Sequence, residues 1–239
     1  MTVAPVAMVL MPEAEFRAKL TRLDTLMSDV DGQARLLLAR CERAVGLLPP
    51  VLSDALAAAI TRLRELIGRF CTETAKIMTS PGSPYALIAA GHDWSARVGG
   101  TLGALPVAAA VAGRGAGRPG AAHWHGPAAE AYARVLPAQR AAITELAALA
   151  GSIDSNLSRA GAGLFALWAG VVLAVLTYLV ELSAAADVAG TGVGAPAAAA
   201  TAAAATAKAI GLVAALAGVF AGLSGEIARN LAVTRDRLG

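Results

Sequence analysis

The chain has 239 residues, of which 56% are apolar but only 4% aromatic, and its net charge is +3. A chain of this length can bury a sizeable core as one or two domains. Because the apolar residues are mostly Ala, Val and Leu, which favour helices, we expect an all-α protein. The small net charge, without a basic run that alternates with aromatics, argues against nucleic acid as a partner.

The charges are distributed unevenly along the chain. Residues 1–79 contain 10 Lys/Arg and 9 Asp/Glu, whereas residues 160–225 carry only Glu181, Asp187 and Lys208. The N-terminal stretch lacks a basic segment and is interrupted by prolines, so we expect no general secretory signal. The chain therefore passes from an amphipathic start to an apolar end.

Residues 12–48 are predicted to form a first amphipathic helix. Pro12, followed by acidic residues, suits a helix start. Apolar residues then recur every three or four positions, with an interruption or bend expected near Gly32. Pro49 ends the helix.

A second amphipathic helix follows, and it completes a helical hairpin. Ser53 is expected to cap this helix, which keeps its apolar stripe to residue 79. The stretch SPGSP at 80–84 then breaks it. Cys41 and Cys71 lie at different distances from the hairpin turn, with an axial mismatch of roughly 19 Å, so we expect two free thiols.

The middle of the chain reads as a broken helix, a linker and a second long helix. Glycines dilute the helical pattern of residues 85–111, and residues 113–120 form a Gly/Arg/Pro loop. This loop lacks the Lys-Ser/Thr pair of a phosphate-binding loop, so we interpret it as a linker. Residues 127–158 then carry one apolar stripe, and a bend rather than a stop is expected at Pro137.

The stretch HWHG at 123–126 lies immediately before this long helix. Gly126 can adopt a positive φ, and Pro127 suits a first helical turn. Trp124 can fold its ring over the end of the hairpin. The stretch is therefore interpreted as a tight turn between two helical segments.

The same residues resemble a known family. Trp124-His125-Gly126 followed by PAAEAYARVLPAQ is similar to the WXG superfamily, small helix-turn-helix proteins of actinobacterial type VII secretion systems. The resemblance covers about residues 85–158 and implies side-by-side association of hairpins into a four-helix bundle. It also implies turn roles for Trp124 and Gly126, and helix packing by Ala128, Ala129 and Tyr132.

One expected feature of the family is missing. Many exported members or their partners carry a Tyr-x-x-x-Asp/Glu signal after the second helix. Tyr85, Tyr132 and Tyr178 are each followed four residues later by an apolar residue. Either a partner supplies the signal or this member is not exported.

Catalysis and metal binding have little support in the sequence. His123 and His125 form a His-x-His pair, but the only other histidine is His92, and a loop histidine is most often solvated. Neither a nucleophile with its base nor a convincing carboxylate pair is recognisable. We therefore expect no enzyme activity, no cofactor, no metal and no small-molecule substrate.

The last third of the chain contains two apolar runs. Residues 160–180 are 21 uncharged residues, long enough to cross the ~30 Å apolar core of a bilayer as a helix. Residues 209–224 form a shorter run, with Arg residues beyond the outer end of each run. The alternative is a soluble Ala-rich helix pair packed on the N-terminal helices. The candidate membrane-inserting residues are Leu164, Phe165, Trp168, Leu173, Leu176, Tyr178, Leu212, Leu216 and Phe220.

We expect an elongated all-α bundle built from helical hairpins, the last of them Ala/Gly-rich and apolar. Residues 1–79 form the amphipathic hairpin, 80–158 the WXG-like module and 159–239 the apolar hairpin. The resemblance implies a type VII secretion-associated substrate or accessory protein, secreted or in the cell envelope. It would act by association with a helical partner or itself, with insertion into a lipid membrane. The alternative is a resident inner-membrane protein with a cytoplasmic docking module.

Overall fold

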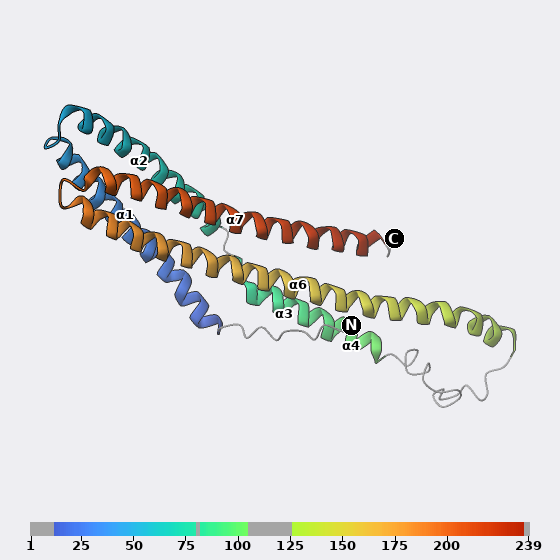
Figure 1. The fold of residues 1–239 in the computed structure, drawn as a ribbon. Helices are drawn as coiled ribbons and strands as arrows, with labels where there is room; N and C mark the ends of the chain where they lie inside the picture. Colours follow the sequence, from blue (N-terminus) through green and yellow to red (C-terminus); the bar gives the residue numbers. More distant parts are fainter. Residues whose placement is uncertain (1–11, 80–81, 105–125, 237–239) are drawn as a thin grey trace, which may run out of the picture. The chain divides into compact units, whose positions relative to one another are not determined.

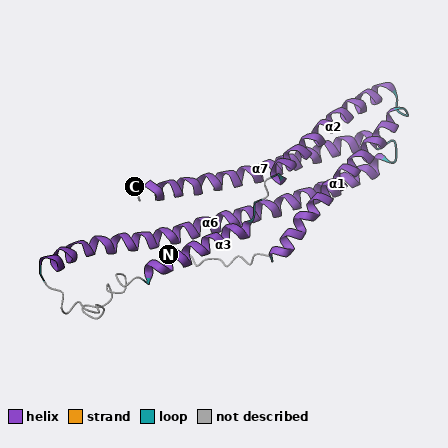
Figure 2. Ribbon diagram, turned by 180° about the vertical axis from the view of Figure 1, so that it is seen from behind, coloured by secondary structure: helices purple, strands orange, loops and turns teal. Residues whose placement is uncertain are grey.

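The computed structural model describes residues 12–79, 82–104 and 126–236, with the backbone alone for residues 103, 129, 132, 133 and 234–236. Throughout these ranges the chain forms helices joined by short turns, and no strand is present in them. This confirms the prediction of an all-α helical bundle. In Figure 2, which is coloured by secondary structure, the described segments are helices joined by loops.

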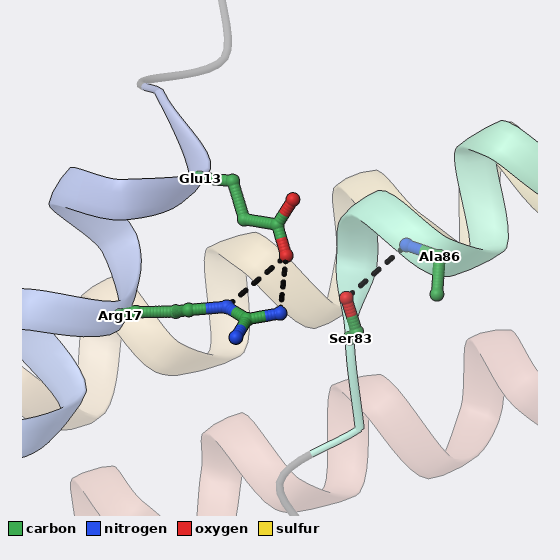
Figure 3. Close-up of polar contacts among 4 residues, drawn as sticks. All are labelled: Glu13, Arg17, Ser83 and Ala86. Atoms are coloured by element: carbon green, nitrogen blue, oxygen red, sulfur yellow. Dashed lines mark hydrogen bonds and ion pairs between the residues drawn. The ribbon is translucent and has the colours of Figure 1, made fainter.

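The N-terminal hairpin consists of helix α1 (Glu13–Val45) and helix α2 (Pro50–Met78) (Figure 1). Helix α1 continues through Gly32, so of the interruption or bend expected there the interruption is absent. Val30 and Ala34, on either side of Gly32, are both buried on one face of the helix. The first turn of α1 is supported by Arg17, which donates to Glu13 Oε1 at 2.7 Å (Figure 3).

Helix α2 begins four residues earlier than predicted. Pro49 is the cap residue, with φ −56° and ψ 150°, and Pro50 takes the first helical position. A proline is tolerated there because its missing N–H would have no partner within the helix. Ser53 is therefore no cap, and its hydroxyl donates to the carbonyl oxygen of Pro50 at 2.8 Å.

The predicted broken helix is present as three short consecutive elements. They are α3 (Pro84–Trp94), a π-helical turn (Ser95–Gly99) and α4 (Gly100–Gly103). Ser83 caps α3, because its Oγ accepts a hydrogen bond from the Ala86 N–H at 3.1 Å (Figure 3). The wider π turn lies where the glycine content of the sequence is high.

Two long helices complete the chain. Helix α6 (Pro127–Ala189) runs through Pro137 and through the boundary that we expected near residue 158. The boundary is absent because residues 156–163 contain no proline and continue the apolar spacing. After a turn at 190–194, in which Gly192 has φ +74°, helix α7 (Ala195–Asp236) begins, and it contains the whole apolar run 209–224.

The described helices contribute to two compact units. The four-helix unit comprises Met1–Gly82 and Ala166–Ala221, so it contains α1, α2, the C-terminal part of α6 and the N-terminal part of α7. The second unit comprises Ser83–Phe165 and Gly222–Gly239. Both α6 and α7 are thus shared between the units.

The core of the four-helix unit is built from large and small side chains on different helices. Helices α1 and α2 contribute mainly leucines, isoleucines and phenylalanines, whereas α7 contributes a row of alanines. Alanines allow a close approach of the neighbouring helices, and the large side chains of the other helices fill the remaining space. The core residues include Leu23, Val30, Leu37, Leu63, Phe70, Val171, Val175, Leu182, Ala198, Ala202 and Val213.

The second unit is packed through glycines. A Cβ atom added to Gly161 on α6 would lie 2.7 Å from the carbonyl oxygen of Pro84, and one added to Gly91 on α3 would lie 2.8 Å from Asp154 Oδ1. These pairs place α3 antiparallel to α6 at a distance that a larger side chain would prevent. In the same part of α6, Arg159 pairs with Glu226 of α7 at 3.2 Å.

Candidate functional site: an apolar hairpin covered on one face

Within the four-helix unit, α1 and α2 cover one face of the α6–α7 hairpin. Trp168 of α6 is only 2% exposed and shares a small cavity with Leu23 of α1 and Met78 of α2. Farther along, the ring centroid of Phe70 lies 4.6 Å from that of Tyr178, with a tilt of 59°. The covered face therefore includes Trp168 and Tyr178, two of the three aromatic residues of the apolar run 160–180.

The opposite faces of α1 and α2 are charged. Helix α1 carries exposed pairs within one helix, such as Arg35 with Asp31, and Arg64 of α2 pairs with Glu42 of α1. Such exposed pairs contribute little to stability, but they keep the outer surface hydrated. The N-terminal hairpin is thus apolar toward α6 and α7 and polar on its outer side.

The outer face of the α6–α7 hairpin is apolar instead. A shallow groove of about 440 Å³ runs between the two helices, lined mainly by alanines such as Ala184 and Ala204. At its edge, the charges of Lys208 and Glu181 pair at 2.9 Å across the hairpin. Exposed apolar side chains on the two helices within this unit are Leu173, Leu176, Val180, Val188, Leu212 and Val219.

A small polar cluster lies inside the four-helix core. The hydroxyl of Thr206 donates to the carbonyl oxygen of Ala202 at 2.6 Å, so the hydroxyl of Tyr178 donates to Thr206 Oγ1 at 2.9 Å. Both side chains are fully buried. This hydrogen bond fixes the register of α6 against α7, because a slip of one residue would leave the buried Tyr178 hydroxyl unpaired.

Arg40 connects α1 to the end of α6. Its Nη1 donates to the carbonyl oxygen of Ala186 at 2.5 Å and lies 3.3 Å from Asp187 Oδ1. The Ala186 carbonyl oxygen also accepts from the Gly190 N–H at 3.1 Å. Because the last turn of the helix carries the negative end of the helix dipole, the guanidinium group of Arg40 stabilises it. Sequence reasoning missed this contact, because nothing in the local pattern of α1 indicates which helix end it will reach.

Cys41 is buried at the same interface. Its Sγ lies 3.9 Å from the carbonyl oxygen of Ala195, the first residue of α7. Burial raises the pKa of the Cys41 thiol, and nearby Glu42 raises it further. Cys71 is half-buried, and burial raises its pKa too. Both thiols are free, as predicted.

The candidate membrane-inserting residues fall on different faces of their helices. Leu164, Trp168 and Tyr178 are buried, Leu173, Leu176 and Leu212 are exposed, and Phe165, Leu216 and Phe220 are intermediate. Leu164 and Phe165 belong to the second unit, and the other seven belong to the four-helix unit. The sequence of the apolar run could not separate these groups, because an apolar residue is compatible with both the buried and the exposed face of these helices.

The turn motif lies at the edge of the described residues. Gly126 has φ +104°, a conformation that side chains rarely adopt, and α6 begins directly after it. Ala128 is exposed. Trp124 and the side chains of Ala129 and Tyr132 lie outside the part of the chain that the structure describes, so their packing roles stay predictions.

Two helical segments, Arg134–Ala189 and Ala195–Val233, are long and apolar enough to span a membrane. They meet this test by length and composition only, and buried core helices of soluble proteins meet it as well. Among the described residues, no group of three His, Cys, Asp or Glu side chains is placed to hold a metal ion.

Comparisons with protein-family models, with curated proteins and with solved structures find no match to this chain.

Proposed function

We propose that this protein is a non-catalytic helical association protein in which α1 and α2 act as a removable cover for an apolar, membrane-active α6–α7 hairpin. One observation carries the proposal: α1 and α2 bury one face of the hairpin while the charges of the unit lie mainly on their own outer sides. The cover keeps Trp168 and Tyr178 away from water until the hairpin meets an apolar environment.

Membrane insertion requires the cover to leave. Residues 12–79 carry 10 Lys/Arg and 9 Asp/Glu, and the outer faces of α1 and α2 display them. Placing charged side chains at the centre of a bilayer costs about 2.5–3.5 kcal/mol each. The α6–α7 hairpin alone carries only three charges between residues 166 and 221, two of which pair with one another. Insertion of the bare hairpin is therefore far less costly than insertion of the whole unit.

Cross-linking tests whether the cover must separate. Replacing Ala195→Cys introduces a thiol beside buried Cys41, and the substitution Cys71→Ser removes the competing thiol. We expect the oxidised protein to remain extractable from phospholipid vesicles by carbonate, and the reduced protein to resist extraction. Equal resistance of the oxidised and reduced proteins would show that α1 does not need to leave.

A more specific proposal concerns the cellular system. The Trp124-x-Gly126 motif and the antiparallel, glycine-mediated packing of α3 on α6 support a type VII secretion-associated substrate or accessory protein. In this proposal the protein leaves the cytoplasm with a partner that supplies the missing Tyr-x-x-x-Asp/Glu signal. Detection of the chain in the culture medium of its native host, lost when Trp124 is replaced by Ala, would support it.

The second candidate is a resident inner-membrane protein with a cytoplasmic docking module. Two features favour it: none of the three tyrosines provides the signal, and two helical segments have the length and composition of membrane spans. Fractionation of the native host separates the candidates. Carbonate-resistant protein in the membrane, with none in the medium, supports the resident protein and contradicts export.

A further inference from the structure

Two turns that are far apart in the sequence lie at the same end of the four-helix unit. One joins α1 to α2 at residues 46–49, and the other joins α6 to α7 at residues 190–194 (Figures 1 and 2). They are close neighbours, because Leu47 of the first turn lines the same small cavity as Gly190 and Gly192 of the second. We call this end, formed by residues 46–52 and 188–194, the tip.

The tip displays the most exposed large aliphatic side chains of the described residues. Val193 is 86% exposed, Val51 81% and Leu47 80%. Leu52 and Val188 add two further exposed side chains at the same end. These side chains lie at the end of the unit where both turns are found, and their exposure to water is unfavourable.

The charges around the tip cancel. Arg40 pairs with Asp187, and Glu42 pairs with Arg64, which leaves Arg43 and Asp54 as one charge of each sign. From Val188 to Ala207 the chain carries no charge at all. An apolar contact at the tip therefore buries no uncompensated charge, and α7 carries no charge for about its first three and a half turns.

We propose that the tip is the part of the protein that first enters a phospholipid bilayer, with the side chains of Leu47, Val51 and Val193 buried in its interfacial region. This inference rests on the proposed function, and it specifies which part of the protein first contacts the bilayer. A bilayer fits because it accepts separate exposed aliphatic side chains without a matching groove. The tip has neither the aromatic or Arg anchor of a typical protein hot spot nor a basic cluster for an anionic surface.

Vesicle binding of two matched variants tests the assignment. In the tip variant Leu47, Val51 and Val193 are replaced by Ser, and in the face variant Leu173, Val180 and Val219 are replaced by Ser. The second set is 65–74% exposed on the outer face of α6 and α7. We expect the tip variant to bind phosphatidylcholine vesicles about tenfold or more weakly than the wild type, because three aliphatic contacts are lost. The face variant should keep its initial binding.

Several results would overturn the assignment. They are equal binding by the tip variant and the wild type, selective loss in the face variant, or binding that needs phosphatidylglycerol and disappears at high salt. A wild type that binds neither vesicle would also overturn it, and would leave a protein groove as the alternative partner of the tip.

A fluorescent label provides a measurement that does not depend on the stability of the tip variant. In protein with Cys41→Ala and Cys71→Ala, an environment-sensitive dye is attached through Val51→Cys or, as the control, through Thr61→Cys on the exposed side of α2. Vesicles should shift the emission of the dye at position 51 to the blue and leave that at position 61 unchanged. Equal emission changes at the two positions would contradict tip entry.

The cross-linked protein separates this inference from the proposed function. When Cys41 is joined to the thiol introduced by Ala195→Cys, the side chains of the tip stay exposed. The cross-linked protein should therefore still bind vesicles, although its α6–α7 hairpin cannot insert. Binding without insertion even after reduction would contradict the removable cover and leave the role of the tip supported. Insertion by the tip variant at the wild-type rate would contradict the role of the tip and leave the removable cover supported.

Discussion

Gly161 is a residue whose importance follows from its neighbours rather than from its helix. An alanine Cβ at this position would lie 2.7 Å from both the Pro84 carbonyl oxygen and the Ile88 Cγ1, and the first of these is backbone. In residues 85–111, glycines indicate only a diluted helical pattern. The sequence could not show that Gly161 permits a helix contact, because its partner is more than 70 residues away along the chain.

Replacing Gly161→Ala should therefore lower the free energy of unfolding by about 1–3 kcal/mol, since α3 must move away from α6. Gly151→Ala is the matched control on the same helix. No atom lies within 4 Å of its added Cβ, so the substitution should stabilise the helix by up to about 1 kcal/mol. Chemical denaturation of both variants measures the difference, and similar changes in the two would contradict the close packing of α3 on α6.

The two thiols should react at different rates. Burial raises the pKa of both Cys41 and Cys71, but Cys41 is fully buried and Cys71 is only half-buried. A raised pKa lowers the fraction of thiolate at a given pH, and the thiolate is the reacting form. We expect alkylation of Cys41 to be the slower reaction at pH 8, with both rates increasing as the pH rises. Mass spectrometry of the singly substituted Cys41→Ser and Cys71→Ser proteins would detect the reverse order, which contradicts the burial of Cys41.

Helix α1 stabilises the end of α6 through a single side chain. Arg40→Met keeps the aliphatic part of the side chain but removes the donor to the Ala186 carbonyl oxygen. Because the contact is partly exposed, we expect a loss of about 1 kcal/mol in the free energy of unfolding. Arg43→Met on the same helix donates only to its own helix and is the control, with an expected change within about 0.5 kcal/mol. Thermal unfolding compares the two variants, and equal melting temperatures would contradict the stabilising role of Arg40.

The amphipathic helices were the elements most accessible to sequence reasoning. The stripes of α1 and α2 identify their buried faces, because the periodic contrast between Leu and charged residues follows the helical repeat. Helices α6 and α7 offer no such contrast. Their alanine and valine residues are apolar on every side, so the sequence predicts the helix but does not show that Trp168 is covered while Leu173 is exposed.

The predicted helix boundaries were wrong where local sequence signals were weak or misleading. Ser53 is a good capping residue, yet Pro50 begins α2 because proline is already suited to the first turn. The expected separation of α6 near residue 158 rested on the change from polar to apolar composition. Composition determines the surroundings of a helix rather than its length, so the chain continues as one helix to Ala189.

The arrangement of the four-helix unit depends on contacts that no local pattern contains. The cover, the tip and the contact between Arg40 and α6 each join residues separated by 90 positions or more along the chain. The sequence analysis did predict the components, an amphipathic hairpin and an apolar one, and it considered their packing as the alternative to insertion. The structure places them together, and the proposed function treats the packed form as the state that precedes insertion.

The most direct test of the removable cover is the rate of Cys41 alkylation in full-length Cys71→Ser protein, measured with and without phosphatidylcholine vesicles. Cys41 Sγ lies in the interface between α1 and the start of α7. If α1 leaves the hairpin on membrane insertion, vesicles should raise the alkylation rate of Cys41 toward that of the urea-unfolded protein. Protein that binds vesicles while Cys41 stays as protected as in solution would contradict the account.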